Sequence, residues 1–229
     1  MKEKENVNER VFLEELVNFQ FNCIVWDLDE TLGDTQRVVK AEFDRLMGTD
    51  YSLRTIDRFD ALSFWAFEDG VATYEAANTV ETRLWTDSRV LSKVSPIPEL
   101  QDFSRKTAGR GKTQYIVTSR NNQLKVVTKL WARQHFPWIP SSKVRITPRR
   151  DVLYDSKYKK KVIATIKPDF VFEDNVNHVS EILESTPAST RIIWLSRELE
   201  TNNLKSERVL VLPGGPKQFS QLMSHNIDI

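Results

Sequence analysis

The chain has 229 residues and a formal net charge of +1 at pH 7; 40% of its residues are hydrophobic and 28% are charged. This length and composition exclude a disordered chain and predict one sizeable domain, or one domain with a modest insertion. A net charge near zero gives no overall preference for nucleic acid or membrane surfaces. The charged amino terminus and the lack of an apolar run of about 20 residues predict a cytoplasmic protein without a membrane span. The single cysteine, Cys23, excludes an internal disulfide.

Five short apolar runs alternate with helical patterns along the chain. The runs are rich in β-forming residues and occupy residues 21–26, 114–119, 169–174, 191–196 and 208–213. Between them, apolar residues three and four positions apart predict helices, for example at 121–136 and 175–186. Strands that alternate with helices form parallel sheets, so we predict an α/β fold with a Rossmann-like parallel sheet flanked by helices.

The segment between the first two predicted strands is far longer than one crossover helix requires. From Gln36 to Val94 its pattern is helical and rich in aromatic residues, and "SPIPEL" at 95–100 then indicates a break and a new helix start. We therefore predict a small α-helical cap at residues 36–94. It would be inserted into a core formed by residues 1–35 and 95–229.

The stretch "IVWDLDETL" places two carboxylates, Asp27 and Asp29, at the end of a predicted buried strand. In open α/β sheets, ligands bind at the carboxyl ends of the strands. Carboxylate oxygens suit Mg²⁺, and one acid can act as a nucleophile while its neighbour transfers protons. An acidic turn without a ligand is the alternative interpretation.

Two later stretches end predicted strands with groups that suit a phosphoryl substrate. In "YIVTSRNN", Thr118 and Ser119 supply hydroxyls and Arg120 supplies further donors, although a hydroxyl here is often only a helix cap. In "DSKYKKKVIATIKPDFVFEDN", a lysine cluster precedes the acids Glu173 and Asp174. One lysine could neutralise charge on a transferring phosphoryl group, while the others would form a solvated helix face.

The order of these elements resembles the haloacid dehalogenase (HAD) superfamily of hydrolases. Its first motif, DxDx(T/V), is similar to Asp27, Asp29 and Thr31, and its second motif to Thr118. Its third motif is a lysine, and its fourth is an acidic pair like Glu173 and Asp174. An acid at the position of Asp29 and the cap between the first two motifs resemble the phosphatase branch with a small helical cap, which includes nucleotidases.

The resemblance implies a Mg²⁺-dependent phosphatase with an aspartyl-phosphate intermediate. Asp27 would be the nucleophile, Asp29 the general acid and base, and Thr118 a hydrogen-bond donor to the phosphoryl group. The helix–strand spacing favours Lys159 as the catalytic lysine, and the close alternatives are Lys157, Lys160 and Lys161. The implied metal ligands are Asp27, Asp29 through its backbone carbonyl, Glu173 and Asp174. The residues predicted to bind substrate are Thr31, Ser119, Arg120 and, in the cap, Trp65.

The predicted substrate is a small phosphorylated metabolite, with a nucleoside monophosphate slightly favoured over a sugar phosphate. One alternative is a terminal phosphatase acting on nucleic acid, with "RITPRRD" at 145–151 and "KYKKK" at 157–161 as basic contacts. The near-zero net charge disfavours this alternative. Another is a non-catalytic binding or regulatory protein that retains the fold. His178 follows the last acidic pair closely enough to touch the site, although packing or capping is its more usual role. The sequence leaves the oligomeric state open.

Overall fold

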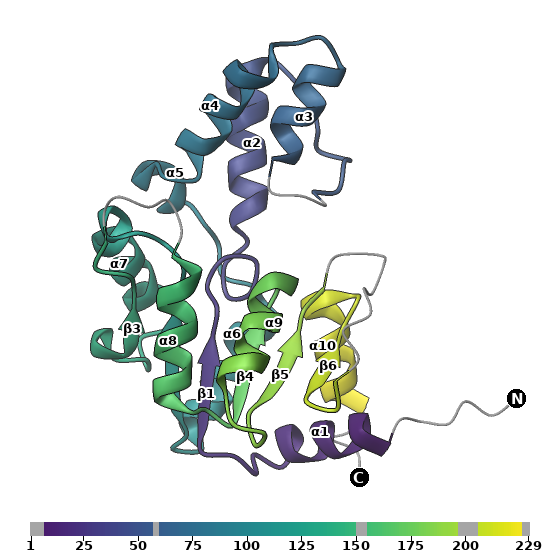
Figure 1. Cartoon of the computed structure of the whole chain (residues 1–229), viewed down its shortest axis with the longest axis vertical. Helices are drawn as coiled ribbons and strands as arrows, with labels where there is room; N and C mark the ends of the chain where they lie inside the picture. The colour runs from purple at the N-terminus through teal and green to yellow at the C-terminus, as the bar shows by residue number, and fades with distance from the viewer. Residues whose placement is uncertain (1–6, 57–59, 150–154, 197–205, 226–229) are drawn as a thin grey trace, which may run out of the picture.

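The structure is a computed structural model that describes residues 7–56, 60–149, 155–196 and 206–225 (Figure 1). Six strands form one parallel sheet in the order β3-β2-β1-β4-β5-β6, which confirms the predicted α/β fold with a Rossmann-like parallel sheet. Within these residues no helix has both the length and the apolar character needed to cross a bilayer. The strands are β1 (Cys23–Trp26), β2 (Thr113–Val117), β3 (Val144–Arg145), β4 (Phe170–Glu173), β5 (Arg191–Trp194) and β6 (Val209–Val211).

Helices cover both faces of this sheet. One hydrophobic cluster includes side chains of α1, α6, α7 and α10, and another includes side chains of α8 and α9. The helices are α1 (Val7–Val17), α2 (Thr35–Met47), α3 (Ala61–Glu68), α4 (Tyr74–Leu84), α5 (Ser88–Leu91), α6 (Pro98–Gly109), α7 (Lys125–His135), α8 (Ser156–Ile166), α9 (Val176–Ser185) and α10 (Gly215–His225).

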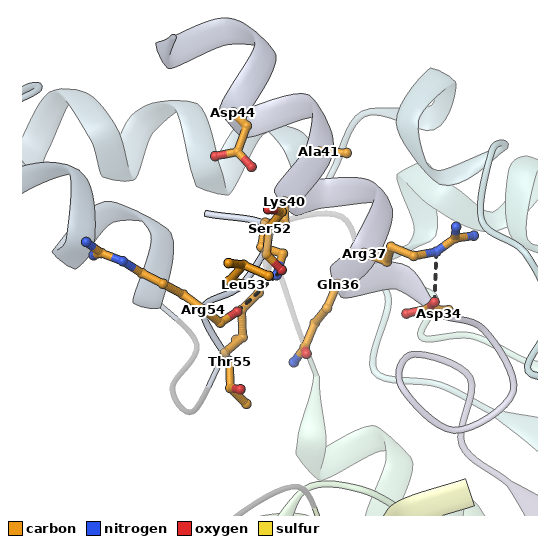
Figure 2. Close-up of a pocket in the computed structure, with 11 residues that line it drawn as sticks. Asp34, Gln36, Arg37, Lys40, Ala41, Asp44, Ser52, Leu53, Arg54 and Thr55 are labelled. Carbon is orange, nitrogen blue, oxygen red and sulfur yellow. Dashed lines mark hydrogen bonds and ion pairs between the residues drawn. The ribbon is translucent and has the colours of Figure 1, made fainter. Parts of the chain in front are cut away.

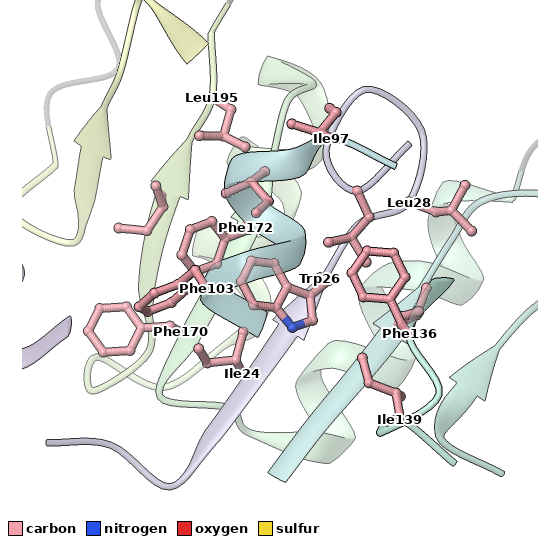
Figure 3. Close-up of a cluster of buried hydrophobic side chains, with 14 of the residues drawn as sticks. Ile24, Trp26, Leu28, Ile97, Phe103, Phe136, Ile139, Phe170, Phe172 and Leu195 are labelled. Carbon is pink, nitrogen blue, oxygen red and sulfur yellow. The ribbon is translucent and has the colours of Figure 1, made fainter. Parts of the chain in front are cut away.

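The central strand β1 shows why a continuous apolar run was needed. Ile24 and Trp26 belong to the first cluster and Val25 to the second, and all three are fully buried. Figure 3 shows Trp26 among the aromatic rings of the first cluster, where its ring centroid lies 4.3 Å from that of Phe172. A strand buried on both faces cannot alternate polar and apolar residues, so its sequence reads as one apolar run.

The edge strand β3 was not predicted from the sequence. It contains only Val144 and Arg145, and it pairs with the end of β2. A strand of two residues is too short to produce a periodic pattern, so the apolar runs predicted five strands where the structure has six.

Helices α2 to α5 lie beyond the carboxyl edge of the sheet and pack on one another (Figure 1). They share a hydrophobic cluster of their own that includes Val39, Phe43 and Leu62. The two connections to the sheet run side by side, because Asp34 N donates to Ser95 O at 3.0 Å and Gly33 bridges Pro96. The division of the chain into a core and a cap at residues 35 and 95 stays a prediction.

Glycine is required where these connections meet the sheet. A Cβ atom on Gly33 would lie 2.9 Å from Val94 Cγ1 and 3.3 Å from the Trp131 ring. The first distance is shorter than real side chains allow, so a larger residue would push the connections apart. Gly33 thus holds the start of α2 close to α7 and to the end of β1.

Candidate active site

Three strands deliver polar residues to the same edge of the sheet. Asp27 directly follows β1 and its backbone N donates to Phe172 O of β4 at 3.0 Å. Thr118 directly follows β2, and Glu173 is the last residue of β4. Because parallel strands end at a common edge, residues separated by up to 146 positions in the sequence meet there.

Three carboxylates at this edge lie close enough to share a metal ion. One oxygen each from Asp27, Glu173 and Asp174 lies within 4.8 Å of the others. Burial, with Glu173 and Asp29 adding to it, raises the pKa of Asp27 to about 6 against the opposing effect of Lys159. Burial and the carboxylates of Asp27 and Glu173 raise the pKa of Asp174 well above its usual range. The cluster thus contains more carboxylates than its surroundings compensate, and its hard oxygen donors fit Mg²⁺.

Lys159 is the one cation that contacts this cluster among the four candidate lysines. Its Nζ lies 2.6 Å from Asp27 Oδ1 and 2.6 Å from Glu173 Oε2, and its side chain is 2% exposed. Burial acts to lower the pKa of Lys159, but the two carboxylates raise it above its usual range. Burial also acts to raise the pKa of Glu173, yet Lys159 and His178 lower it to about 2.

The other three lysines point elsewhere on α8. Lys157 and Lys161 are exposed, and Lys160 pairs with Glu184 at 3.2 Å. Successive helical residues are turned by about 100°, so neighbouring lysines cannot share the buried face. A signal for Lys159 was present in the sequence, because Ile163 follows it by four positions and is also buried.

Asp29 is held by a separate cation. Arg120 donates from Nε to Asp29 Oδ2 at 2.9 Å and from Nη2 to Oδ1 at 2.5 Å. Thr35 Oγ1 donates to the same Oδ1 at 2.6 Å, and Arg120 Nη1 donates to Thr128 Oγ1 at 3.2 Å. Arg120 was predicted to bind substrate; in the structure its side chain is 2% exposed and its guanidinium forks onto Asp29.

Three hydroxyl groups predicted to bind phosphate are all buried. Thr118 Oγ1 accepts from the backbone N of Arg120 at 3.2 Å. In the part of the chain that the structure describes, the hydroxyls of Thr31 and Ser119 have no hydrogen-bond partner. Buried polar groups are nearly always hydrogen-bonded, so two orphan hydroxyls suit a missing polar ligand.

His178 joins the site, although packing or capping is the role that we expected for it. Its Nδ1 lies 3.2 Å from Glu173 Oε1 and 3.3 Å from Lys159 Nζ. Asn175 begins α9 by accepting from the backbone N–H groups of Asn177 and His178, which turns the imidazole toward the acidic cluster. The capping residue just after the fourth motif was the sequence signal for this position.

The helical segment above the site has a cavity of about 490 Å³ between α2 and residues 52–56 (Figure 2). Lys40 Nζ donates to two backbone carbonyl oxygens of residues 52–56, at 3.1 and 2.9 Å, and ties this segment to α2. Gln36 lines the cavity, and its backbone N donates to Glu30 Oε1 at 2.5 Å. The cavity wall is therefore directly bonded to the loop that follows β1.

Trp65 is not brought into the acidic cluster by any contact that the structure describes. Its ring packs edge-on against Tyr51 at 5.5 Å, and the Arg54 guanidinium lies 5.5 Å above it. Both partners belong to the same helical segment, so these contacts support packing within that segment.

The fold is similar to known hydrolases, although no protein-family model and no curated protein sequence matches the chain. A haloacid dehalogenase-like family hydrolase from Streptococcus pneumoniae is 11% identical over 88% of this chain and 97% of its own, with a TM-score of 0.55. A predicted phosphatase from Clostridium acetobutylicum is 11% identical over 91% and 99%, also at 0.55. A putative HAD-hydrolase from Bacillus subtilis bound to magnesium is 14% identical over 89% and 98%, at 0.54. At such identities the similarity establishes the fold alone, a parallel α/β sheet that this chain shares with these three proteins.

Proposed function

We propose that this protein is a Mg²⁺-dependent phosphatase that hydrolyses a phosphomonoester through an aspartyl-phosphate on Asp27. One observation carries the proposal. Asp27 has one oxygen on the buried ammonium of Lys159 and lies within metal-sharing distance of Glu173 and Asp174. An acidic turn without a ligand would not need a buried cation beside it, and exposed turns relieve such repulsion with water instead.

The metal would be held by Asp27, Asp174 and Glu173, with the backbone carbonyl of Asp29 as the further predicted ligand. When bound, Mg²⁺ supplies positive charge that neutralises carboxylate and phosphoryl oxygens. Glu173 already binds Lys159 and His178, so in our proposal it serves the lysine as well as the metal.

The reaction would proceed in two displacements. In the first, a carboxylate oxygen of Asp27 attacks phosphorus, the ester P–O bond breaks, and Asp29 gives a proton to the leaving oxygen. In the second, Asp29 takes a proton from water, the water oxygen attacks phosphorus, and the Asp27–phosphorus bond breaks to release phosphate. Lys159 and the Thr118 hydroxyl would stabilise the charge on the phosphoryl oxygens.

The segment of residues 36–94 would act as the cap in our proposal. Its own hydrophobic cluster and the paired connections at Gly33 and Pro96 support a unit that moves over the site as one body. The nucleotidase-like branch, the small-metabolite substrate and the cytoplasmic location remain predictions from the sequence.

The test is release of phosphate from a panel of phosphomonoesters with Mg²⁺, by wild type and Asp27→Asn in parallel. The panel contains nucleoside 5′- and 3′-monophosphates, sugar phosphates and phosphorylated oligonucleotides. Turnover of one class that is lost in the variant supports the proposal. Turnover that survives in the folded variant would contradict the role of Asp27, and a folded wild type without turnover would favour a non-catalytic binding protein.

A further inference from the structure

The positive charge of this chain is concentrated in one continuous stretch. Residues 103–150 contain twelve of the 33 Lys and Arg residues and no Asp or Glu. The remaining 181 residues carry 21 basic residues and all 32 acidic ones. The net charge of +1 therefore conceals a strongly basic part and a strongly acidic remainder.

The fold places part of this charge at one end of the sheet. Helix α7 and the edge strand β3, which pairs with β2, lie at the left of Figure 1 with α8 beside them. Other cations of the stretch lie elsewhere, because Arg105 and Lys106 of α6 pair with Asp102 and Arg120 is buried against Asp29. Helix α8 adds two more exposed lysines. We call the outward-facing cations of this region the basic edge, and its members are Lys125, Lys129, Arg133, Arg145, Lys157 and Lys161.

The basic edge is a cluster of cations without counter-charges. Some exposed arginines elsewhere pair with acids, as Arg37 does with Asp34 and Arg54 with Asp69. Within residues 7–56, 60–149, 155–196 and 206–225, no side chain of the basic edge forms an ion pair. Unpaired cations on one side of a protein attract a partner with several negative charges.

The basic edge adjoins the candidate active site. The backbone N of Thr118 donates to Arg145 O at 3.2 Å, which places Arg145 at the carboxyl edge of the sheet next to the site. The backbone N of Asp155 donates to Ser119 O at 3.0 Å and so anchors the start of α8 at the same loop. From Lys125 the cations continue along α7 to Arg133, a distance of about 12 Å at roughly 1.5 Å per residue.

We propose that the basic edge binds the phosphodiester backbone of a nucleic acid strand and that the phosphomonoester presented to Asp27 is at the end of that strand. The second half of this inference rests on the proposed function. A nucleic acid fits better than a membrane, because the cations wrap around an edge. Helix α7 packs on one face of the sheet and α8 on the other, so a flexible strand can follow this curved surface and a flat bilayer cannot. The small net charge, on which the sequence prediction disfavoured nucleic acid, averages over both parts of the chain.

The experiment measures binding of a fluorescent single-stranded oligonucleotide with a terminal phosphate to full-length Asp27→Asn protein, so that binding is observed without turnover. Binding is followed by anisotropy at several salt concentrations. The edge variant adds Lys125→Gln, Arg133→Gln and Arg145→Gln. Each phosphate contact on a single strand contributes about 0.7 to the slope of log affinity against log salt. We expect the edge variant to bind about tenfold or more weakly and its slope to decrease by about 2.

A matched control removes three exposed cations outside the basic edge, with the substitutions Arg110→Gln, Lys167→Gln and Lys217→Gln. We expect its affinity and slope to stay close to those of the parent. Equal weakening in both variants would overturn the proposal, as would an edge variant that binds like its parent. Binding of wild type to anionic phosphatidylserine vesicles but not to the oligonucleotide would overturn it in favour of a membrane. Thermal unfolding of each variant verifies that it is folded.

The same set of proteins separates this inference from the proposed function. With Asp27 restored, the edge variant should hydrolyse a small phosphomonoester at the wild-type rate and lose activity only on the phosphorylated oligonucleotide. Edge-dependent binding without hydrolysis of any ester would leave the nucleic-acid surface standing and refute the phosphatase. Hydrolysis of small esters without edge-dependent binding would support the phosphatase and refute the nucleic-acid surface.

Discussion

The Asp27→Asn substitution separates the electrostatic cost of the acidic cluster from its chemistry. Burial is the main cause that raises the pKa of Asp27 from 3.8 to about 6, so its ionised form is disfavoured in the folded protein. A shift of about two pKa units corresponds to about 3 kcal/mol at neutral pH. Asparagine removes the charge and keeps an oxygen for Lys159. We therefore expect metal-free Asp27→Asn to exceed metal-free wild type in unfolding free energy by up to about 3 kcal/mol.

The pH dependence of this difference follows from the direction of the shift. The folded-state pKa lies above the unfolded value, so folding favours the protonated form of Asp27. The penalty is fully present above about pH 6 and disappears as the pH falls toward 3.8. The stability advantage of Asp27→Asn should therefore shrink on acidification over this range.

Urea unfolding, followed by tryptophan fluorescence, measures both effects with a chelator and with Mg²⁺. A ligand at one hundred times its Kd stabilises the folded state by about 2.7 kcal/mol, so wild type should gain about this amount and Asp27→Asn far less. Asp102→Asn, which removes an exposed acid paired with Arg105, is the control and should behave like wild type within about 1 kcal/mol. If metal-free Asp27→Asn is no more stable than wild type, or if both gain equally from Mg²⁺, the electrostatic argument is wrong.

Three further substitutions test individual contacts. Lys159→Gln leaves two buried carboxylates without their cation and should lower the free energy of unfolding in urea by about 3–5 kcal/mol. The control Lys160→Gln removes a partly exposed ion pair and should lower it by less than about 1 kcal/mol. Arg120→Lys keeps the positive charge but loses the two hydrogen bonds to Asp29. Steady-state kinetics should show a kcat about tenfold lower and a smaller change in KM. An unchanged kcat would contradict a positioning role for Arg120. Trp65→Ala should lower the unfolding free energy by about 2 kcal/mol through lost packing, and an unchanged KM would remove it from the predicted substrate contacts.

The sequence predicted the sheet and the edge at which the candidate site lies because both depend on local patterns. A strand buried on two faces must be an apolar run, and Asp27 and Glu173 end or follow such runs directly. The single buried lysine was also accessible in principle, since Lys159 and Ile163 share a helical face.

The pairing of Asp29 with Arg120 could not be predicted in the same way. The two residues are 91 positions apart, and a loop arginine after a strand has several possible partners. Its choice depends on how α7 packs, because Thr128 of α7 binds the same guanidinium. The sequence predicted basic contacts at residues 145–151 and 157–161 for the nucleic-acid alternative, but not that α7 adds cations beside them. Whole-chain charge contains no spatial information, and only the strand order places Arg145 next to Thr118.

The two cations of the site divide its acids into a balanced part and an unbalanced part. Arg120 binds Asp29 one to one through its fork. In the part of the chain that the structure describes, one ammonium, that of Lys159, contacts Asp27 and Glu173 in the cluster of three carboxylates that can share a metal. Burial without compensation is costly, and the raised pKa of Asp27 and Asp174 is the sign of that cost. A divalent cation supplies the missing charge, whereas a second lysine would supply only half of it. The charge count therefore favours a divalent cation independently of the similarity in fold.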